Sequence, residues 1–129
     1  MENYPKSKAI PLSQGQLSLW SGQRLHPNVP LYNMVHTFEI EGAINVATFQ
    51  KAFQYLIYDS DALRTVFQEK DGVPHQMVHE KFPYMLDFLD FSKKERNTIE
   101  HWIKERSKLV LDLSECCFDS ALLKIDNGK

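Results

Sequence analysis

The side chains best suited to acid–base, metal or nucleophilic chemistry are five histidines and two cysteines. His75 and His79 are four residues apart, a spacing that places two zinc ligands on one face of a helix. However, Pro74 and the preceding Asp71-Gly72 turn predict a strand here, which would separate the two histidines by about 13 Å along one face. We therefore favour surface histidines on an edge strand over a metal site.

The two cysteines, Cys116 and Cys117, are adjacent and would rarely bond to each other in an ordered domain. A nucleophilic cysteine needs a base or a helix N-terminus to lower its pKa, and neither cysteine has a histidine nearby in sequence. We expect both to be buried as small hydrophobic side chains. Free thiols also indicate a reducing, cytoplasmic setting. His36 could act as a general base, but one histidine on an apolar strand face is more often a hydrogen-bonded core residue.

Arg64 follows Asp59 and Asp61 at a predicted helix end that leads into a strand. It could order a hydrogen-bond network in an active site, because a guanidinium has five N–H donors. It could equally form a structural ion pair with Asp61, and we favour this interpretation because a buried arginine needs a partner. Nowhere does the sequence assemble a nucleophile, a base and an orienting group.

Composition limits the classes of protein that remain. With 129 residues, 43% hydrophobic and 12% aromatic, the chain is predicted to be one globular domain. A formal charge of −2 with dispersed basic residues does not favour nucleic acid as a partner. The apolar runs are too short to cross a bilayer, and the first residues lack the apolar stretch of a secretory signal. We therefore expect neither a nucleic-acid nor a membrane partner.

The elements expected in the first half are two helices and one strand. Ser13 and Gln16 form a candidate capping box at the start of a helix that stops at His26-Pro27. Asn33–Glu41 alternates apolar and polar side chains and predicts a strand, with Met34, His36, Phe38 and Ile40 on one face. A second helix is expected from about Asn45 to Tyr58.

In the second half, Arg64–Lys70 and Gln76–His79 predict a hairpin around Asp71-Gly72. Tyr84–Phe88 is a further candidate strand. Ser92 and Glu95 predict another capping box, opening a helix to about Lys108 with a Glu100–Lys104 pair outside. The alternation of helices with one-sided strands predicts an α/β two-layer sandwich, with residues 1–8 as a flexible lead-in and residues 9–129 as the domain.

The last predicted strand, Ala121–Ile125, precedes a tight turn at Asp126-Asn127-Gly128. A hairpin turn brings in a second strand, but only Lys129 follows it. We therefore expect the strand at Ala121–Ile125 to have an unpaired edge, or to pair with another copy of the chain.

Two segments resemble core motifs of one enzyme family. Residues 13–20, SQGQLSLW, are similar to the first motif of condensation domains from nonribosomal peptide synthetases, S-x-A-Q-x-R-L-W, with Gly15 in place of alanine and Ser18 in place of arginine. Residues 61–67, DALRTVF, resemble the end of the second motif, R-H-E-x-L-R-T-x-F, with Asp61 in place of glutamate. The matching motif residues, all expected to be structural, are Ser13, Gln16, Leu17, Trp20, Asp61, Leu63, Arg64, Thr65 and Phe67.

The resemblance covers about residues 8–129 and implies an N-terminal, chloramphenicol-acetyltransferase-like lobe, incomplete before its active-site strand and loop. Family members join acyl or aminoacyl groups carried on phosphopantetheine, using the second histidine of a third motif, H-H-x-x-x-D-G. No two histidines are adjacent in this sequence, so we expect no catalytic, cofactor or metal site in this chain and no activity from it alone. The implied partners are the remainder of the domain and the carrier domains.

Two other functions remain open. The chain could be a stand-alone interaction module that keeps the scaffold without chemistry. It could also be part of a related acyltransferase that acts on coenzyme A or on alcohol substrates, because fold similarity alone does not fix the reaction.

Overall fold

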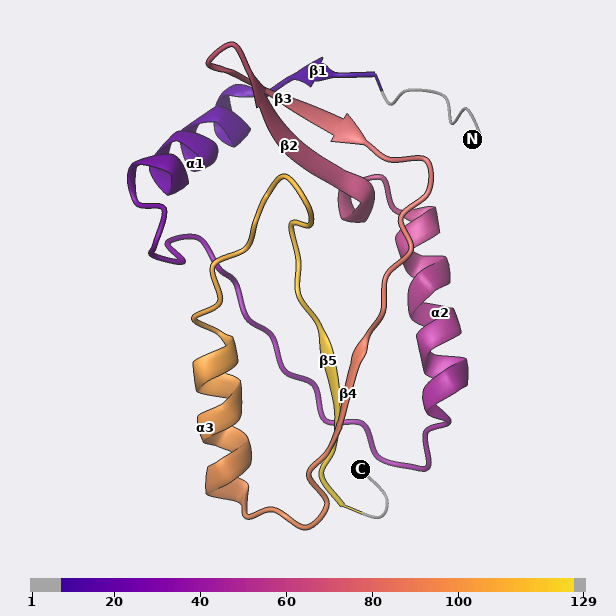
Figure 1. Cartoon of the computed structure of the whole chain (residues 1–129). Coiled ribbons are helices and arrows are strands. Elements are labelled where there is room, and N and C mark those ends of the chain that lie inside the picture. The colour runs from indigo at the N-terminus through magenta and orange to yellow at the C-terminus, as the bar shows by residue number, and fades with distance from the viewer. Residues whose placement is uncertain (1–7, 127–129) are drawn as a thin grey trace.

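The computed structural model describes residues 8–126 as a mixed α/β arrangement with two small sheets (Figure 1). Three helices are present in this part of the chain: α1 (Gln14–Leu25), α2 (Val46–Asp59) and α3 (Arg96–Arg106). The strands are β1 (Ile10–Pro11), β2 (Thr65–Lys70), β3 (Val73–Val78), β4 (Asp87–Asp90) and β5 (Ala121–Lys124), with a short 3-10 turn at Ala62–Arg64. The predicted α/β class is confirmed.

The two sheets have different topologies. The first is antiparallel with order β1-β3-β2, and the second is a parallel pair of β4 and β5. The predicted hairpin is confirmed, and its turn has positive φ at both Asp71 (53°) and Gly72 (79°). These angles suit a two-residue turn whose twist matches that of the flanking strands.

The predicted starts of the first two helices are confirmed. The Ser13 hydroxyl accepts from the Gln16 N–H at 3.2 Å, and the Gln16 side chain accepts from the Ser13 N–H at 2.9 Å, which completes the capping box. At α2 the Asn45 side chain accepts from the Thr48 N–H at 2.9 Å. In both cases a side chain satisfies an N–H group that the helix itself leaves unpaired.

The strand expected at Tyr84–Phe88 is displaced to Asp87–Asp90. The reason lies in two glutamines of α2, which take the backbone hydrogen bonds of the preceding segment. The Gln50 amide donates to the Tyr84 carbonyl (2.8 Å) and accepts from the Leu86 N–H (2.7 Å). The Gln54 amide likewise donates to the Phe82 carbonyl (2.9 Å) and accepts from the Tyr84 N–H (2.8 Å). Strand pairing begins at Asp87, directly after Leu86, which is the last residue whose backbone these glutamines bind.

The predicted start of the third helix and its outer ion pair are wrong. The Ser92 hydroxyl and N–H both donate to the Asp90 carboxylate, at 2.5 and 3.0 Å, so this hydroxyl caps a turn and not a helix. The helix α3 begins at Arg96, with Glu95 at its N-cap and no side-chain capping bond. Glu100 pairs with Arg96 (3.2 Å), which precedes it by one turn, and not with Lys104.

The segment 33–41 does not form the predicted strand. In Figure 1 it runs diagonally across the lower half of the molecule, on the way from α1 to α2. Within residues 8–126 it has no strand beside it, and backbone without a hydrogen-bonded neighbour cannot form a ladder. The core expectation for His36 is therefore also wrong: its side chain is exposed and stacks only on Phe38, 6.4 Å away between ring centroids.

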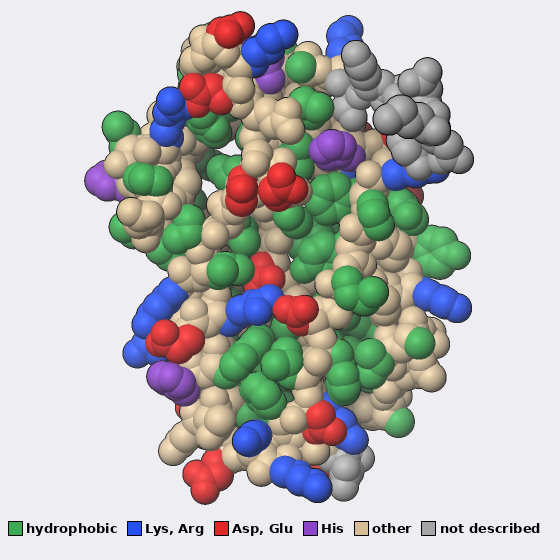
Figure 2. Space-filling model, in the orientation of Figure 1, with side chains coloured by type: hydrophobic (Ala, Val, Ile, Leu, Met, Phe, Trp, Pro, Cys, Tyr) green, Lys and Arg blue, Asp and Glu red, His purple; other side chains and the backbone are tan. Residues whose placement is uncertain are grey.

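The hydrophobic core is small. Ile57 of α2 and Val66 of β2 are fully buried, and Leu86 is nearly so. Many other large apolar side chains are exposed, and Figure 2 shows hydrophobic side chains gathered in the middle of one face, over β4 and β5. Within the described residues, no helix combines the length and the apolar character needed to span a bilayer.

The expected unpaired edge is present at β5. Its strand pairs with β4 on one side, and no strand of residues 8–126 lies on its other side. The hairpin turn expected at Asp126-Asn127-Gly128 and most of the lead-in at residues 1–8 lie outside the described residues, so both remain predictions.

Candidate functional site

The two motif segments meet at β3. The amides of Gln16, from the first motif, and Gln76 of β3 are paired reciprocally at 3.1 Å. Gln76 lies opposite Phe67, from the second motif, in the β2–β3 register, and its amide also donates to the Pro11 carbonyl at 3.1 Å. Gln16 thus caps α1 and fastens it to the hairpin, a double role that requires both the oxygen and the nitrogen of an amide.

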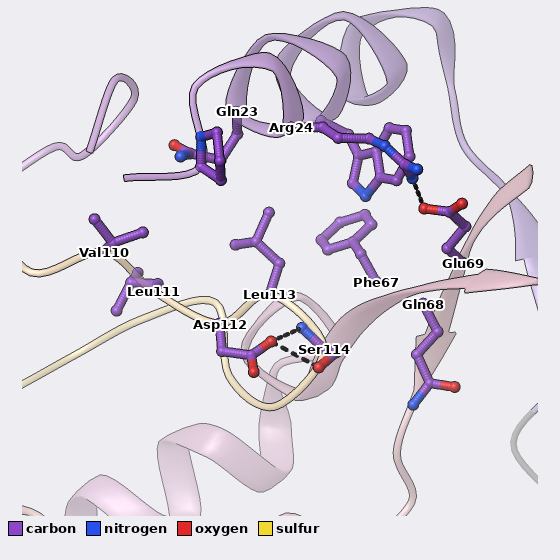
Figure 3. Close-up of a pocket in the computed structure, with 12 residues that line it drawn as sticks. Gln23, Arg24, Phe67, Gln68, Glu69, Val110, Leu111, Asp112, Leu113 and Ser114 are labelled. Carbon is purple, nitrogen blue, oxygen red and sulfur yellow. Dashed lines mark hydrogen bonds and ion pairs between the residues drawn. The ribbon is translucent and has the colours of Figure 1, made fainter. Parts of the chain in front are cut away.

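An open groove lies between α1, the start of the hairpin and residues 110–114 (Figure 3). Its volume is about 490 Å³, and it includes the motif side chains of Trp20 and Phe67. The Phe67 N–H donates to the Leu113 carbonyl at 2.8 Å, which ties the irregular segment before β5 to β2. Figure 3 shows Phe67 and Leu113 pointing into the groove from the side opposite α1.

The charged side chains of this groove are already paired. Arg24 forms an ion pair with Glu69, and its guanidinium lies 5.0 Å from the Trp20 ring centroid. The Asp112 carboxylate accepts from the Ser114 hydroxyl (2.6 Å) and N–H (3.0 Å), and these bonds lower the pKa of Asp112. The Ser114 hydroxyl donates to a carboxylate, and no histidine lines the groove. The groove is therefore a concave surface without an activated nucleophile.

Two motif side chains, Arg64 and Asp61, form an ion pair, and Arg64 is the more buried of the two. Its guanidinium donates to the Asp61 carboxylate (2.5 Å), to the Ile57 carbonyl at the end of α2 (3.2 Å) and to the His79 carbonyl after β3 (2.5 Å). The side chain is 12% exposed, whereas that of Asp61 is 81% exposed. The favoured ion pair with Asp61 is confirmed, and the two carbonyls show that Arg64 also joins α2 to the hairpin.

The remaining motif residues lie close to these contacts. The Thr65 hydroxyl donates to the Asp61 carbonyl at 2.8 Å, and Leu63 is half-buried in the 3-10 turn before β2. Leu17, in the first turns of α1, is 43% exposed.

The other candidates do not form a catalytic set. His75 lies on the central strand of its sheet, so the expected edge position is wrong: the two-residue β1 covers the outer side of β3. Its Nδ1 lies 3.1 Å from the Val73 carbonyl, and His79 packs against the Phe82 ring. Among the described residues no group of three or more histidine, cysteine or carboxylate side chains could hold a metal ion.

Both thiols are part-buried, and burial works against their reactivity. The Cys116 Sγ donates to the Phe118 carbonyl (3.2 Å) and the Cys117 Sγ to the Leu113 carbonyl (3.7 Å). Burial raises the pKa of the Cys116 thiol and raises the pKa of Cys117 to about 11. A thiolate nucleophile requires the opposite shift, so these contacts agree with the predicted packing role.

Sequence reasoning missed the cluster that holds β5. The Arg106 guanidinium, at the end of α3, binds Asp119 through two bonds of 2.6 and 2.7 Å and Asp87 of β4 at 2.6 Å. These carboxylates, Asp119 first, raise the pKa of Arg106 above its ordinary value. Beside it, the Ser120 N–H and hydroxyl lie 3.0 and 2.9 Å from the Tyr84 hydroxyl. The only signals were an arginine in the last turn of a predicted helix, Asp87 within one predicted strand and Asp119 just before another.

The family model of the condensation domain matches residues 6–129, nearly the whole chain. The chain belongs to the condensation-domain family. Among its relatives, a linear gramicidin synthase protein of Brevibacillus parabrevis is 35% identical over 67% of this chain, which is 1% of that protein. A dimodular nonribosomal peptide synthase of Bacillus subtilis (strain 168) is 30% identical over 79% of this chain, which is 4% of that protein.

Solved condensation domains share the fold. The starter condensation domain of rhizomide synthetase superposes with a TM-score of 0.86 and 27% identity, covering 95% of this chain and 32% of that chain. The first condensation domain of the calcium-dependent antibiotic synthetase, at 22% identity, has a TM-score of 0.84 over 95% of this chain and 30% of that chain. The chain therefore spans under a third of these solved chains and corresponds to the N-terminal part of a condensation domain.

Proposed function

We propose that this chain forms part of the scaffold of a condensation domain that makes amide bonds in a nonribosomal peptide synthetase. The substrates would be acyl or aminoacyl groups held on the phosphopantetheine arms of carrier domains. The observation that carries the proposal is the convergence of both family motifs at one junction, where Gln16 meets Gln76 beside Phe67. The described motif side chains contact backbone and one another, as a framework requires.

The general base of this reaction would lie outside the 129 residues. The sequence has no H-H-x-x-x-D-G motif, and the histidines described above are not paired with a nucleophile. Without a group that positions or deprotonates the attacking amine, the barrier to amide formation stays high. We therefore expect the chain by itself to be inactive with carrier-bound donor and acceptor.

A chimera tests the proposal directly. Residues 9–126 would replace the matching segment of the starter condensation domain of rhizomide synthetase, whose fold this chain shares. We expect a cooperatively melting protein that forms the amide product, detected by mass spectrometry of the acceptor. A chimera that melts cooperatively but gives no amide would contradict the proposal, and turnover by the 129-residue chain alone would contradict the assignment of the base.

The chimera assay should compare several acyl donors and both amine and alcohol acceptors. The starter domain of rhizomide synthetase has been solved in complex with C8-CoA, which supports including acyl-CoA among the donors. Amine acceptors should react and alcohol acceptors should not. Exclusive reaction with alcohols would favour the related-acyltransferase alternative.

The proposed partners follow from the same role. They are the remainder of the condensation domain and the carrier domains that deliver the substrates, and the proposed location is the cytoplasm, where the two free thiols stay reduced. A stop codon directly after Lys129 in the gene, with no continuation into the third motif, would favour the interaction-module alternative.

A further inference from the structure

Residues 34–41 expose a continuous run of apolar side chains. Met34 is 86% exposed, Phe38 is 84% exposed, and about half of the Val35 and Ile40 surfaces are exposed. Soluble domains rarely leave so continuous an apolar stretch uncovered. In the complete domain, another element should therefore pack on it.

The backbone of this segment is equally bare. At its start the Asn33 amide donates to the Ser107 and Leu109 carbonyls, at 3.2 and 2.7 Å, and at its end Asn45 caps α2. Between these anchors, the described part of the chain gives residues 34–41 no hydrogen bond. A segment held at both ends, with its N–H and C=O groups free, is ready to receive a strand.

The strand β5 offers a second open edge. It pairs in parallel with β4, and half of the N–H and C=O groups of a strand point away from its neighbour. No strand of residues 8–126 receives these groups on the other side of β5. The side chains of β5 are already half-buried, so a strand added here would extend a packed sheet.

The two open edges run in the same direction. Figure 1 shows residues 33–41 and β5 both descending toward the end of the molecule where the C-terminus is marked, between α3 and α2. The turn that the sequence predicts at Asp126-Asn127-Gly128 would return the chain antiparallel to β5. A strand that follows it would also be antiparallel to residues 33–41, and a strand can form hydrogen bonds on both of its sides.

We propose that one strand from the remainder of the condensation domain lies between β5 and residues 33–41 and joins them into a single sheet. The remainder is the occupant because this chain covers only 32% of the solved starter domain with which it shares the fold. The accessible surface of the chain is 9948 Å², whereas a compact monomer of 15.1 kDa exposes about 7,100 Å², as expected for a piece whose neighbours are missing. The proposal rests on the family of the chain and not on amide formation.

Hydrogen exchange with mass spectrometry tests the inserted strand. It compares the 129-residue chain with the chimera in which residues 9–126 replace the matching segment of the rhizomide synthetase starter domain. Amides of residues 34–41 should exchange freely in the chain alone and at least about 100-fold more slowly in the chimera, and β5 should gain protected amides. The central strand β3, paired on both sides, is the control and should be protected in both proteins.

Phe38→Ser tests whether the same strand covers the apolar side chains. In the chain alone, the variant should leave exchange unchanged, because Phe38 is exposed and its ring contact is with His36. In the chimera, the loss of a buried phenyl group should speed exchange of residues 34–41 by roughly 10- to 100-fold. The same substitution in the two contexts is its own matched control.

Three results would overturn the proposal. They are a chimera with protected β3 but freely exchanging residues 34–41, protection of residues 34–41 without a gain at β5, and a crystal structure of the chimera with anything other than one strand between the two segments. None of these measurements depends on turnover. An inactive chimera with both segments protected would therefore contradict the proposed function and leave this inference intact.

Discussion

Replacing Arg106 with methionine should destabilise the chain far more than the same replacement at Arg96. Both residues belong to α3, and arginine and methionine have similar helix propensities, so the helix itself is little affected. Arg106 is 34% exposed and joins Asp119 and Asp87, which precede β5 and begin β4. Arg96 is 79% exposed and reaches only Glu100.

The magnitude follows from the three contacts that Arg106 loses. The bidentate pair with the part-buried Asp119 should contribute about 1–1.5 kcal/mol, between the values for buried charged bonds and for surface pairs. The half-exposed Asp87 should add about 0.5 kcal/mol, and the guanidinium 5.7 Å from the Trp102 ring centroid about 0.5 kcal/mol more. The free energy of unfolding should therefore fall by about 2 kcal/mol, which lowers Tm by roughly 8 °C in a chain of this length.

Urea denaturation monitored by tryptophan fluorescence measures both variants. Arg96→Met should lower the free energy of unfolding by less than about 0.5 kcal/mol, as exposed i,i+4 pairs do. Amide exchange should accelerate across Ala121–Lys124 in Arg106→Met only, because Asp119 lies just before that strand. Equal losses of stability in the two variants, with β5 equally protected, would refute the assignment of Arg106 as the residue that holds β5.

Three further expectations concern the motif junction and the thiols. Arg64→Met should cost about 3 kcal/mol in urea denaturation because two carbonyls and a carboxylate lose their donor, whereas Asp61→Asn should cost under about 1 kcal/mol, and similar losses would argue against the carbonyl contacts. A double-mutant cycle of Gln16→Ala and Gln76→Ala should give a coupling of about 0.5–1.5 kcal/mol, and a value near zero would count against the amide pair. Burial raises the pKa of Cys117 from 9.0 to about 11. The contribution of the buried, protonated thiol to the free energy of unfolding should therefore be intact below pH 9 and be lost as the pH rises toward 11. The ultraviolet absorbance of the thiolate should follow the same range, and a midpoint near 9 would contradict the burial argument.

Local signals in the sequence predicted the parts of the fold that local contacts stabilise. The capping box at Ser13 and Gln16 involves residues three apart, and the Asp71-Gly72 turn depends on the φ angles of two neighbours. Such elements need no knowledge of distant residues. The ion pair of Arg64 with Asp61 was predictable for the same reason, since it joins residues three apart.

Contacts between distant residues explain what the sequence could not predict. The displacement of β4 depends on Gln50 and Gln54, about thirty residues earlier, which occupy backbone groups that a strand would have used. Alternation of side chains at 33–41 predicted a strand, but a strand also needs a hydrogen-bonded partner, and periodicity carries no information about partners. At α3, the serine that looked like an N-cap was already bonded to Asp90.

In this part of a condensation domain, the motif residues position helices and strands and do not supply a reacting group. Gln16, Arg64 and Phe67 bind helix ends, carbonyls and a neighbouring segment, so their loss would move elements and not remove a reacting group. The strand β5 is placed by a different set, led by Arg106, at the opposite end of α3 from the exposed Arg96 pair. If the reacting imidazole is carried by a segment that pairs with β5, its position depends on the Arg106 cluster more than on either motif. Substitutions at Arg106 in an active domain should then lower kcat while leaving the motif junction intact.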